Sequence, residues 1–201
     1  ADAQYRHDHH TYLVDPKSGA GLIAKEFAAP EQGVMLTVFK KNGLTVKAFS
    51  VDHKPVHPAV GYHFEYEGRT AVISGDTTQS KNVEMVSKNV DLLVHEALSN
   101  ELINLIQATA ENKQMPILAK VMCDIPDYHT SPVEAAQVAA AANARHLMYY
   151  HIVPALPAPG MEALFLRGTD DAYKGPITLG KDGSVITLPA NSDEILEDDW
   201  L

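Results

Sequence analysis

The sequence predicts an α/β fold in which β-strands and α-helices alternate along a chain of one-domain length. Short apolar runs of strand character recur from Gly33 onward, and the pair Asn42-Gly43 is typical of a hairpin turn. Between these runs lie segments with helix-start signals, such as the serine, proline and glutamate at residues 131–134. The 201 residues, of which 45% are hydrophobic, are enough to bury a single core.

The strand pattern begins at Gly33, so we divide the chain into an irregular segment over residues 1–32 and a domain over residues 33–201. Two alternating runs, VMLTVF and LTVKAFSV, flank the turn KKNG and predict a β-hairpin. The run AVGYHFEYEG then turns at a Glu-Gly pair into RTAVIS, which predicts two further neighbouring strands.

The middle of the chain predicts helices between buried strands. Ser80 suits the N-cap of a short helix that ends at Ser87. The run VDLLV that follows is apolar enough for a strand buried on both faces. Residues 99–112 and 117–122 then predict two helical pieces.

The last third repeats this alternation. The segment TSPVEAAQVAAAANA opens with a complete capping box at Ser131 and predicts a helix, and HLMYY predicts a buried strand. We expect one helix over residues 161–173 and a closing hairpin formed by PITLG and SVITLP. The acidic tail SDEILEDDW is expected to be loosely held.

Charge and cysteine content narrow the classes of function. A formal net charge of −10 argues against a large nucleic-acid interface, because phosphate binding depends on clustered Lys and Arg. The single Cys123 excludes an intrachain disulfide and a multi-cysteine zinc site. No apolar run approaches transmembrane length, so no membrane partner is predicted. The first residues, ADAQYRHDHH, lack an initiator Met, which suggests a piece of a longer protein and leaves the compartment open between cytoplasm and periplasm.

Polar side chains follow several of the predicted strands at the point where each strand ends. These are His53, Asp76, the pair His95-Glu96, and His151. Side chains just past strand ends collect on one rim of an α/β sheet, and imidazole with carboxylate suits zinc or a similar borderline metal. We therefore predict that His53, Asp76 and His151 converge there. Asp76 and His151 should lie within roughly 8 Å, the reach of a bridged metal pair with ligand bonds of about 2 Å.

Five motifs together resemble the C-terminal half of a metallo-β-lactamase-fold hydrolase, in the ribonuclease Z and arylsulfatase-like branch. They are DHKPVHPAVGYHFEYEGR, SGDT, DLLVHEAL, YHTSPVEAA and YYHIVP, and they span most of the chain from Gly33 onward. The resemblance implies the C-terminal half of an αββα sandwich, with a mixed sheet and helices. It also implies a hydrolase that uses two zinc ions.

The resemblance assigns a role to each matching residue. It implies that His53 completes the shell of the first metal, that Asp76 bridges both metals, and that His151 binds the second. Glu96 and His129 match a catalytic pair that assists proton transfer, which predicts a hydrogen bond between them. An exchange of roles between His53 and His57 stays open, and so does a separate mononuclear site built on the histidines of HDHH (7–10).

The family's first-half signature, HxHxDH, is absent from the sequence. We therefore expect zinc to bind weakly or not at all to this chain alone, and activity to require a separate N-terminal half that carries HxHxDH. A half-sandwich also leaves a sheet face uncovered, so that half, or a homodimer that buries the same face, is the expected protein partner.

The substrate predicted from sequence is a small ester: a phosphodiester, a sulfate ester or a lactone, attacked by a metal-bound hydroxide. In tRNA-processing relatives an arm that grips tRNA sits between the GYR and GDT motifs, and here only a short stretch separates Tyr62 from Ser74. Together with the acidic charge, this disfavours nucleic acid as a partner. Two alternatives stay open: a ribonuclease Z that cuts tRNA 3′ ends, and a non-catalytic binding or assembly module that has lost half of its metal site.

Overall fold

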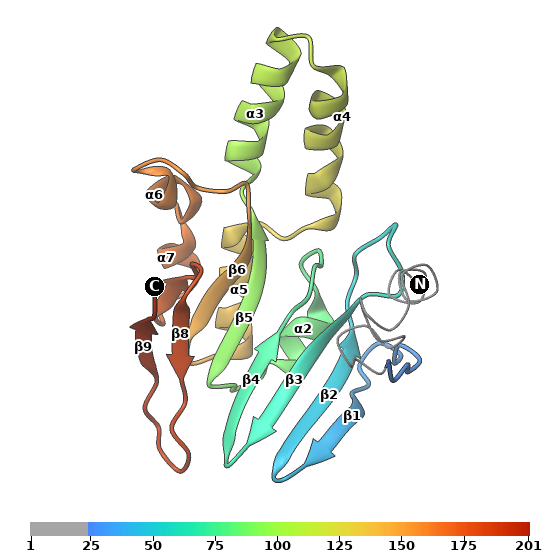
Figure 1. The fold of residues 1–201 in the computed structure, drawn as a ribbon, viewed down its shortest axis with the longest axis vertical. Coiled ribbons are helices and arrows are strands. Elements are labelled where there is room, and N and C mark those ends of the chain that lie inside the picture. Colours follow the sequence, from blue (N-terminus) through green and yellow to red (C-terminus); the bar gives the residue numbers. More distant parts are fainter. Residues whose placement is uncertain (1–23) are drawn as a thin grey trace, which may run out of the picture.

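The computed structural model describes residues 24–201, which form a seven-stranded mixed sheet, helices and a separate two-stranded ribbon (Figure 1). The sheet order is β1-β2-β3-β4-β5-β6-β7, antiparallel from β1 to β4 and parallel from β4 to β7. The strands are β1 (Leu36–Lys41), β2 (Leu44–Ser50), β3 (Val60–Tyr66), β4 (Arg69–Ile73), β5 (Leu92–Leu98), β6 (Leu147–Val153), β7 (Ile177–Leu179), β8 (Ser184–Thr187) and β9 (Leu196–Asp199).

Two tight turns set the antiparallel part of the sheet. Asn42 and Gly43 have φ values of 51° and 82°, and Glu67 and Gly68 have φ values of 47° and 77°. Positive φ at both central residues matches the right-handed twist of the flanking strands, which is why Asn-Gly favours such hairpins. Both predicted turns are present, and the second joins β3 directly to β4 with no inserted arm.

Helices connect the parallel strands and also build a projecting hairpin. Ser80, Ser99 and Ser131 cap three of them through their side chains, and the capping box at Ser131 is complete, as predicted. Helices α3 and α4 stand beyond the end of the sheet as an antiparallel pair (Figure 1). The helices are α2 (Lys81–Val86), α3 (Asn100–Asn112), α4 (Pro116–Asp124), the 3₁₀ turn η2 (Ile125–Tyr128), α5 (Pro132–Ala142), α6 (Met161–Phe165) and α7 (Thr169–Ala172).

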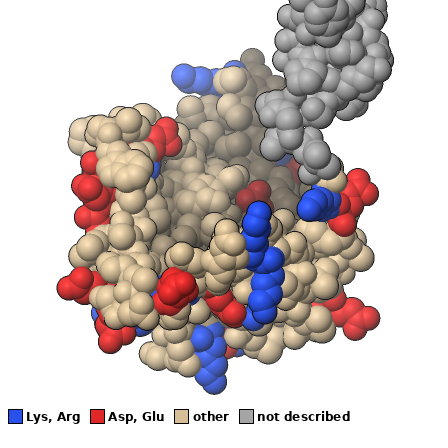
Figure 2. Space-filling view, turned by 60° about the horizontal axis from the view of Figure 1, so that its bottom comes forward, with Lys and Arg blue, Asp and Glu red and all other residues tan. Residues whose placement is uncertain are grey.

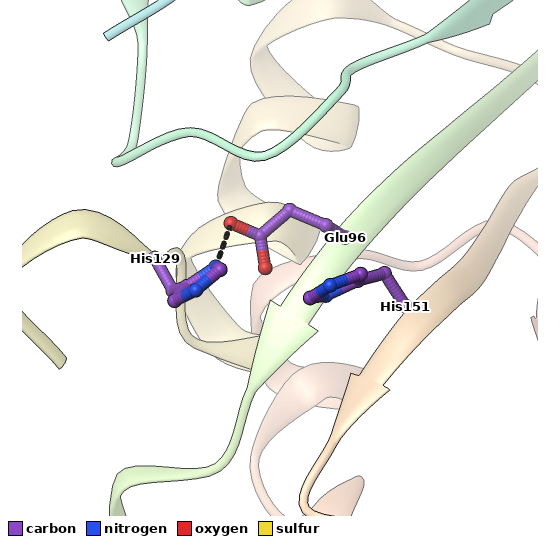
Figure 3. A group of neighbouring side chains, drawn as sticks. All are labelled: Glu96, His129 and His151. Atoms are coloured by element: carbon purple, nitrogen blue, oxygen red, sulfur yellow. Dashed lines mark hydrogen bonds and ion pairs between the residues drawn. The ribbon is translucent and has the colours of Figure 1, made fainter. Parts of the chain in front are cut away.

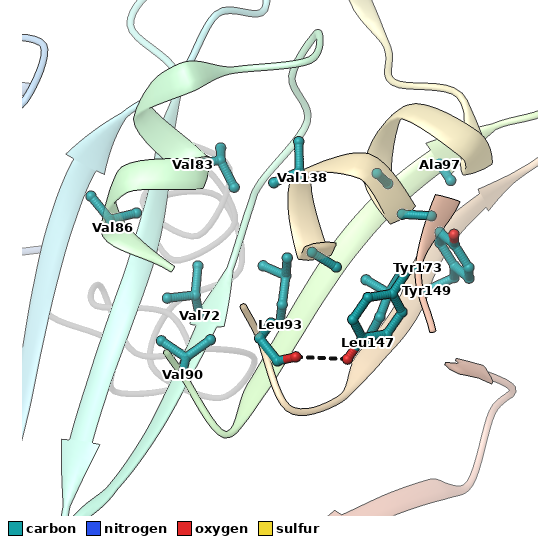
Figure 4. Close-up of a cluster of buried hydrophobic side chains, with 14 of the residues drawn as sticks. Val72, Val83, Val86, Val90, Leu93, Ala97, Val138, Leu147, Tyr149 and Tyr173 are labelled. Carbon is teal, nitrogen blue, oxygen red and sulfur yellow. Dashed lines mark hydrogen bonds between the residues drawn. The ribbon is translucent and has the colours of Figure 1, made fainter. Parts of the chain in front are cut away.

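The core lies between the sheet and the helices on one of its faces. Phe49, Val72, Leu93 and Tyr149 lie on this face of the sheet and are completely buried. Figure 4 shows the last three packed with residues of α2 and α5. The alanines of α5 let that helix approach the sheet closely, because a methyl group is the only side chain between the two backbones.

The opposite face of the sheet is apolar but only partly covered. The strand register places Tyr62, Phe64, Ile73, Val94 and Met148 on it, and each is intermediate in burial. A sheet with helices on one face and an uncovered apolar second face is what a half-sandwich requires. The predicted fold class is thereby confirmed; that a separate half or a second copy covers this face stays a prediction.

The structure corrects the prediction for the last 40 residues. Residues 161–173 form two short helices, because Gly168 has φ of 81° and breaks the continuous helix. The expected closing hairpin does not form: β7 pairs in parallel with β6, and β8 pairs with β9 from the acidic tail. A strand edge left open by β6 offers a full row of backbone partners, which no local turn signal in the sequence reports.

The acidic tail is also held more firmly than predicted. The Arg69 guanidinium donates to the backbone carbonyls of Pro189, Ser192 and Glu194, and it pairs with Asp91 at 3.1 Å. Arg69 and Asp91 are both buried. A buried guanidinium with several acceptors is stable only while the tail supplies them, so this segment is part of the fold.

Buried neutral histidines make the fold sensitive to mild acid. Burial lowers the pKa of His63 and of His146 below 6.5, against smaller opposing effects of Glu65 and Glu197. The unfolded chain therefore takes up protons that the folded chain excludes as pH falls through about 6.5. We expect the contribution of His63 and His146 to the free energy of unfolding to be fully present above that pH and to decrease below it, measured by urea unfolding between about pH 7.5 and about pH 5.5.

A pair of variants separates protonation from hydrogen bonding in this prediction. His146→Gln should reduce the pH dependence, because the titrating ring is gone. Thr178→Val removes only the hydroxyl 2.7 Å from His146 Nε2 and should lower stability similarly at both pH values. An unchanged pH dependence in His146→Gln would contradict the assignment.

Candidate metal centre

The predicted site residues come together at one end of the sheet. His53 lies in the loop after β2, Asp76 follows β4, and Glu96 and His151 lie near the ends of β5 and β6. His129 is placed by η2, just before the N-cap of α5. Because β4, β5 and β6 run in parallel, their carboxyl ends deliver these side chains to the same rim.

The separations fit a single polar cluster. His151 Nε2 lies 3.7 Å from Asp76 Oδ2, well inside the predicted limit, so their predicted proximity is confirmed. The His129 ring is 5.5 Å from the ring of His151 and 5.1 Å from that of His53. The side chains of His151 and Asp76 are 41% and 38% exposed, so this part of the cluster is open to a ligand from outside.

A bulge in β6 aims His151 at this cluster. Glu96 pairs with Tyr150 and Ala97 pairs with Ile152, so His151 is an extra residue in its strand. Its φ of 43° is uncommon for a residue with a side chain. Strict alternation would turn His151 toward the helix-covered face, opposite to Tyr150. The bulge instead turns it toward Asp76, which is the kind of re-aiming that bulges provide near active sites.

The orientation of His53 is set by a backbone carbonyl. Its Nδ1 lies 2.8 Å from the carbonyl oxygen of Tyr128. A carbonyl only accepts, so Nδ1 carries the hydrogen and Nε2 keeps a free lone pair. An imidazole fixed in this way is suited to bind a metal through Nε2.

Glu96 is held by three donors on one of its two oxygens. Oε1 accepts hydrogen bonds from His129 Nδ1 at 3.0 Å and from the backbone N–H groups of Thr77 and Thr130, both at 3.1 Å. The predicted Glu96–His129 hydrogen bond is therefore present. The carboxylate is completely buried, and its Oε2 has no hydrogen-bond partner among the residues that the structure describes. Figure 3 shows this second oxygen pointing into the space between His129 and His151.

The environment of His129 favours its protonated form. Burial lowers the pKa of this imidazole, but the hydrogen bond and the charge of Glu96, together with the charge of Asp76, outweigh it and raise the pKa above 6.5. An imidazole with a raised pKa is suited to hold a proton and to release it to a substrate atom.

The donor set fits a borderline cation. Ligand atoms of Glu96, His129 and His151 all lie within 4.8 Å of one another, and the unpaired Glu96 Oε2 is aimed between the two imidazoles. Imidazole nitrogen and carboxylate oxygen together suit zinc and its neighbours. The two rings are nearly parallel, 20° apart, at a separation of 5.5 Å. The lone pair of a ring nitrogen lies in the plane of its ring, so two stacked, nearly parallel rings do not aim their nitrogens at one point, which favours separate roles for His129 and His151.

Two other histidine predictions have different outcomes. His57 is exposed and lines a cavity of about 260 Å³ beside His53, and no described contact joins it to the cluster. An exchange of roles between the two residues stays open. The mononuclear site predicted for HDHH (7–10) lies outside the described residues.

Sequence reasoning missed three backbone groups that hold the cluster: the amides of Thr77 and Thr130 and the carbonyl of Tyr128. Thr77 and Thr130 do lie in predicted motifs, since Thr77 follows Asp76 in SGDT and Thr130 follows His129 in HTS. Every residue carries a backbone amide, however, and only the folded chain brings those of residues 77 and 130 to the same carboxylate.

The chain is similar to proteins of the β-lactamase superfamily. A model of the beta-lactamase superfamily domain matches residues 10–152. A putative ribonuclease Z from Mycobacterium tuberculosis is 29% identical over 181 residues, which cover 90% of this chain and 71% of that protein. Ribonuclease Z from Mycobacterium marinum is 32% identical over 147 residues, 73% of this chain and 48% of that protein. The crystal structure of the metallo-β-lactamase fold protein YhfI from Bacillus subtilis shares the fold, with a TM-score of 0.52 and 18% identity over 77% of this chain and 52% of that chain.

The chain spans only part of the relatives it matches: 71% of the first protein above, 59% of ribonuclease Z from Mycobacterium tuberculosis strain H37Rv, and 48% of the Mycobacterium marinum protein. These relatives are named as ribonucleases, and the prediction that nucleic acid is disfavoured as a partner is therefore wrong. Net charge is a sum over the whole surface and does not report the field at one site. Acidic and basic side chains are interspersed over the face in Figure 2. Among the described residues, no helix is long and apolar enough to cross a bilayer.

Proposed function

Because the chain belongs to the β-lactamase superfamily and to its ribonuclease Z branch, we propose that it forms part of a metal-dependent hydrolase that cleaves phosphodiester bonds in RNA. The observation that carries this proposal is the single cluster of Asp76, His151, His53 and the Glu96–His129 pair at the rim of the sheet. A cluster of this composition suits hydrolysis of a phosphate ester, because it combines metal ligands with a proton donor.

Three side chains of this chain would hold the metal. Asp76, with two carboxylate oxygens, would be shared by two ions, and His151 and His53 would each serve one of them. We take the metal to be zinc on the chemistry of these donors. A metal held by these residues would supply activation of water and polarisation of the phosphoryl group. Two ions need further ligands, for which an HxHxDH segment is the proposed source.

The Glu96–His129 pair would manage the proton of the reaction. Glu96 Oε1 fixes His129 with its Nδ1–H pointing inward, so Nε2 is the atom that can carry a proton to the substrate. The amides of Thr77 and Thr130 lock the carboxylate, which keeps the imidazole from rotating. His129 would then donate its proton to the oxygen that leaves the phosphorus atom.

Hydrolysis of a small ester is the second candidate function. It is favoured by the two-residue turn at Glu67 and Gly68, which leaves no arm between β3 and β4 to grip a folded RNA. Such an enzyme would use the same cluster with the same proton transfer. The two candidates therefore differ in substrate size and not in mechanism.

A substrate comparison tests the proposal. The zinc-loaded chain is assayed alone and together with an HxHxDH-bearing half of a ribonuclease Z, on a 3′-extended tRNA transcript and on bis(p-nitrophenyl) phosphate. We expect cleavage of the transcript at one position near its 3′ end, and only with both halves present. Turnover of the small diester with an intact transcript would support the second candidate. Failure on both substrates, with zinc bound, would contradict a hydrolase.

A further inference from the structure

His95 is a completely buried imidazole that the proposed mechanism does not use. It precedes Glu96 on β5, so alternation points it to the helix-covered face while Glu96 faces the cluster. Its partner in the strand register is Tyr149, which is part of the hydrophobic core. A histidine in such surroundings needs an explanation, because burying a polar ring costs free energy unless it is hydrogen-bonded.

One hydrogen bond gives that explanation. Nδ1 of His95 donates to the backbone carbonyl of Glu96 at 2.7 Å. Nε2 is buried and has no hydrogen-bond partner in the part of the chain that the structure describes. An unpaired buried polar atom costs about 1–3 kcal/mol, so an apolar side chain would serve packing better at this position. The useful atom of the ring is therefore its Nδ1–H.

The carbonyl that accepts this bond lies where the sheet is irregular. The register between β5 and β6 shifts between Glu96 and Ala97, across from the extra residue His151. A bulge disrupts the regular ladder of backbone hydrogen bonds, and groups beside it need other partners. The carbonyl of Glu96 finds one in the neighbouring side chain.

We infer that His95 is a positioning residue: its ring fixes the Glu96 carbonyl and thereby the bulge that turns His151 toward Asp76. The same contact holds the backbone of Glu96, whose carboxylate orients His129. The consequence for metal binding rests on the proposed function, whereas the consequence for the backbone geometry does not.

The experiment measures both consequences in the 201-residue chain, with an HxHxDH-bearing half of a ribonuclease Z added for the zinc titration. His95→Leu removes the donor and keeps a buried side chain of similar size. It should weaken zinc binding, measured by calorimetric titration, by about ten- to a hundredfold. Without metal, it should also shift the ¹H–¹⁵N amide resonances of Ala97 and His151. His95→Asn keeps an N–H donor close to the position of Nδ1 and should largely restore both measurements.

Tyr149→Phe is the matched control. It deletes a buried hydrogen bond, from the Tyr149 hydroxyl to the Pro132 carbonyl, at the register partner of His95. It should lower stability and leave zinc affinity and both amide resonances near wild type. Equal loss of zinc affinity in Tyr149→Phe and His95→Leu would overturn the inference, since general loss of packing would explain both.

The two proposals fail in different ways. If the wild-type chain binds no zinc even with the HxHxDH-bearing half added, the proposed metal site is wrong, and the amide resonances still decide the role of His95. Unchanged resonances of Ala97 and His151 in folded His95→Leu would overturn that role. If His95→Leu does not fold, His95→Gln replaces it. The glutamine amide reaches the position of Nε2 and should not restore the contact with the Glu96 carbonyl. Wild-type resonances of Ala97 and His151 in His95→Gln would therefore also overturn the inference.

Discussion

Replacing Asp76 with asparagine is expected to reduce phosphodiester hydrolysis by the metal-loaded enzyme about a thousandfold, if the bridging carboxylate is worth several kcal/mol in the transition state. An amide has one acceptor oxygen and no charge, so it cannot hold two cations together. The same substitution should weaken zinc binding, because His151 lies only 3.7 Å from the lost carboxylate and would keep no anionic neighbour on that side. The measurements are kcat with saturating substrate and calorimetric titration with zinc.

The control for this prediction is Asp171→Asn on α7, an exposed carboxylate whose one ion pair among residues 24–201 is with Lys174 at 3.7 Å. It makes the same chemical change at a residue outside the cluster and should leave both zinc affinity and kcat near wild type, since exposed ion pairs contribute little. An Asp76→Asn enzyme with normal affinity and normal kcat would show that the ions, if bound, lie elsewhere on the rim.

Replacing Glu96 with glutamine is expected to lower kcat about a hundredfold and to move its pH dependence. A general acid must be protonated to act, so activity falls as pH rises through the pKa of His129. The Glu96 carboxylate helps to raise that pKa above 6.5. Without its charge the pKa falls, and the loss of activity should begin at lower pH. A bound cation would lower the pKa of His129 in the wild type and in Glu96→Gln alike. The pKa of the variant would therefore stay below that of the wild type.

Glu134→Gln provides the matched control for Glu96→Gln. Glu134 accepts hydrogen bonds from the backbone N–H and the hydroxyl of Ser131 in the capping box of α5. Ser131 directly follows Thr130, whose amide holds Glu96. This variant should lose some stability and keep the pH profile of the wild type. A pH profile of Glu96→Gln that coincides with the wild-type curve would remove His129 from the role of proton donor.

The sequence alone determined most of the elements and all of the side chains of the cluster. Alternation, Asn-Gly and Glu-Gly turns, and serine caps are local signals, so the strands up to β6 and the helices up to α5 followed from them. The position of His53, Asp76, Glu96 and His151 near strand ends predicted one shared rim, because parallel strands end together. Net charge was a poor guide to substrate class, because it averages over the whole surface.

The tertiary structure alone decided what depends on partners distant in the chain. The choice of β7 between β6 and β8 depends on which strand edge is open after the rest has folded. The same holds for the tail, which Arg69 binds just ahead of the strand β9 that pairs with β8. The bulge that re-aims His151 is a register shift between two strands, so neither strand encodes it by itself. The amides of Thr77 and Thr130 converge on Glu96, and the carbonyl of Tyr128 on His53, through backbone atoms that every residue carries. The sequence could therefore name the acid and the imidazoles, but only the fold could orient them.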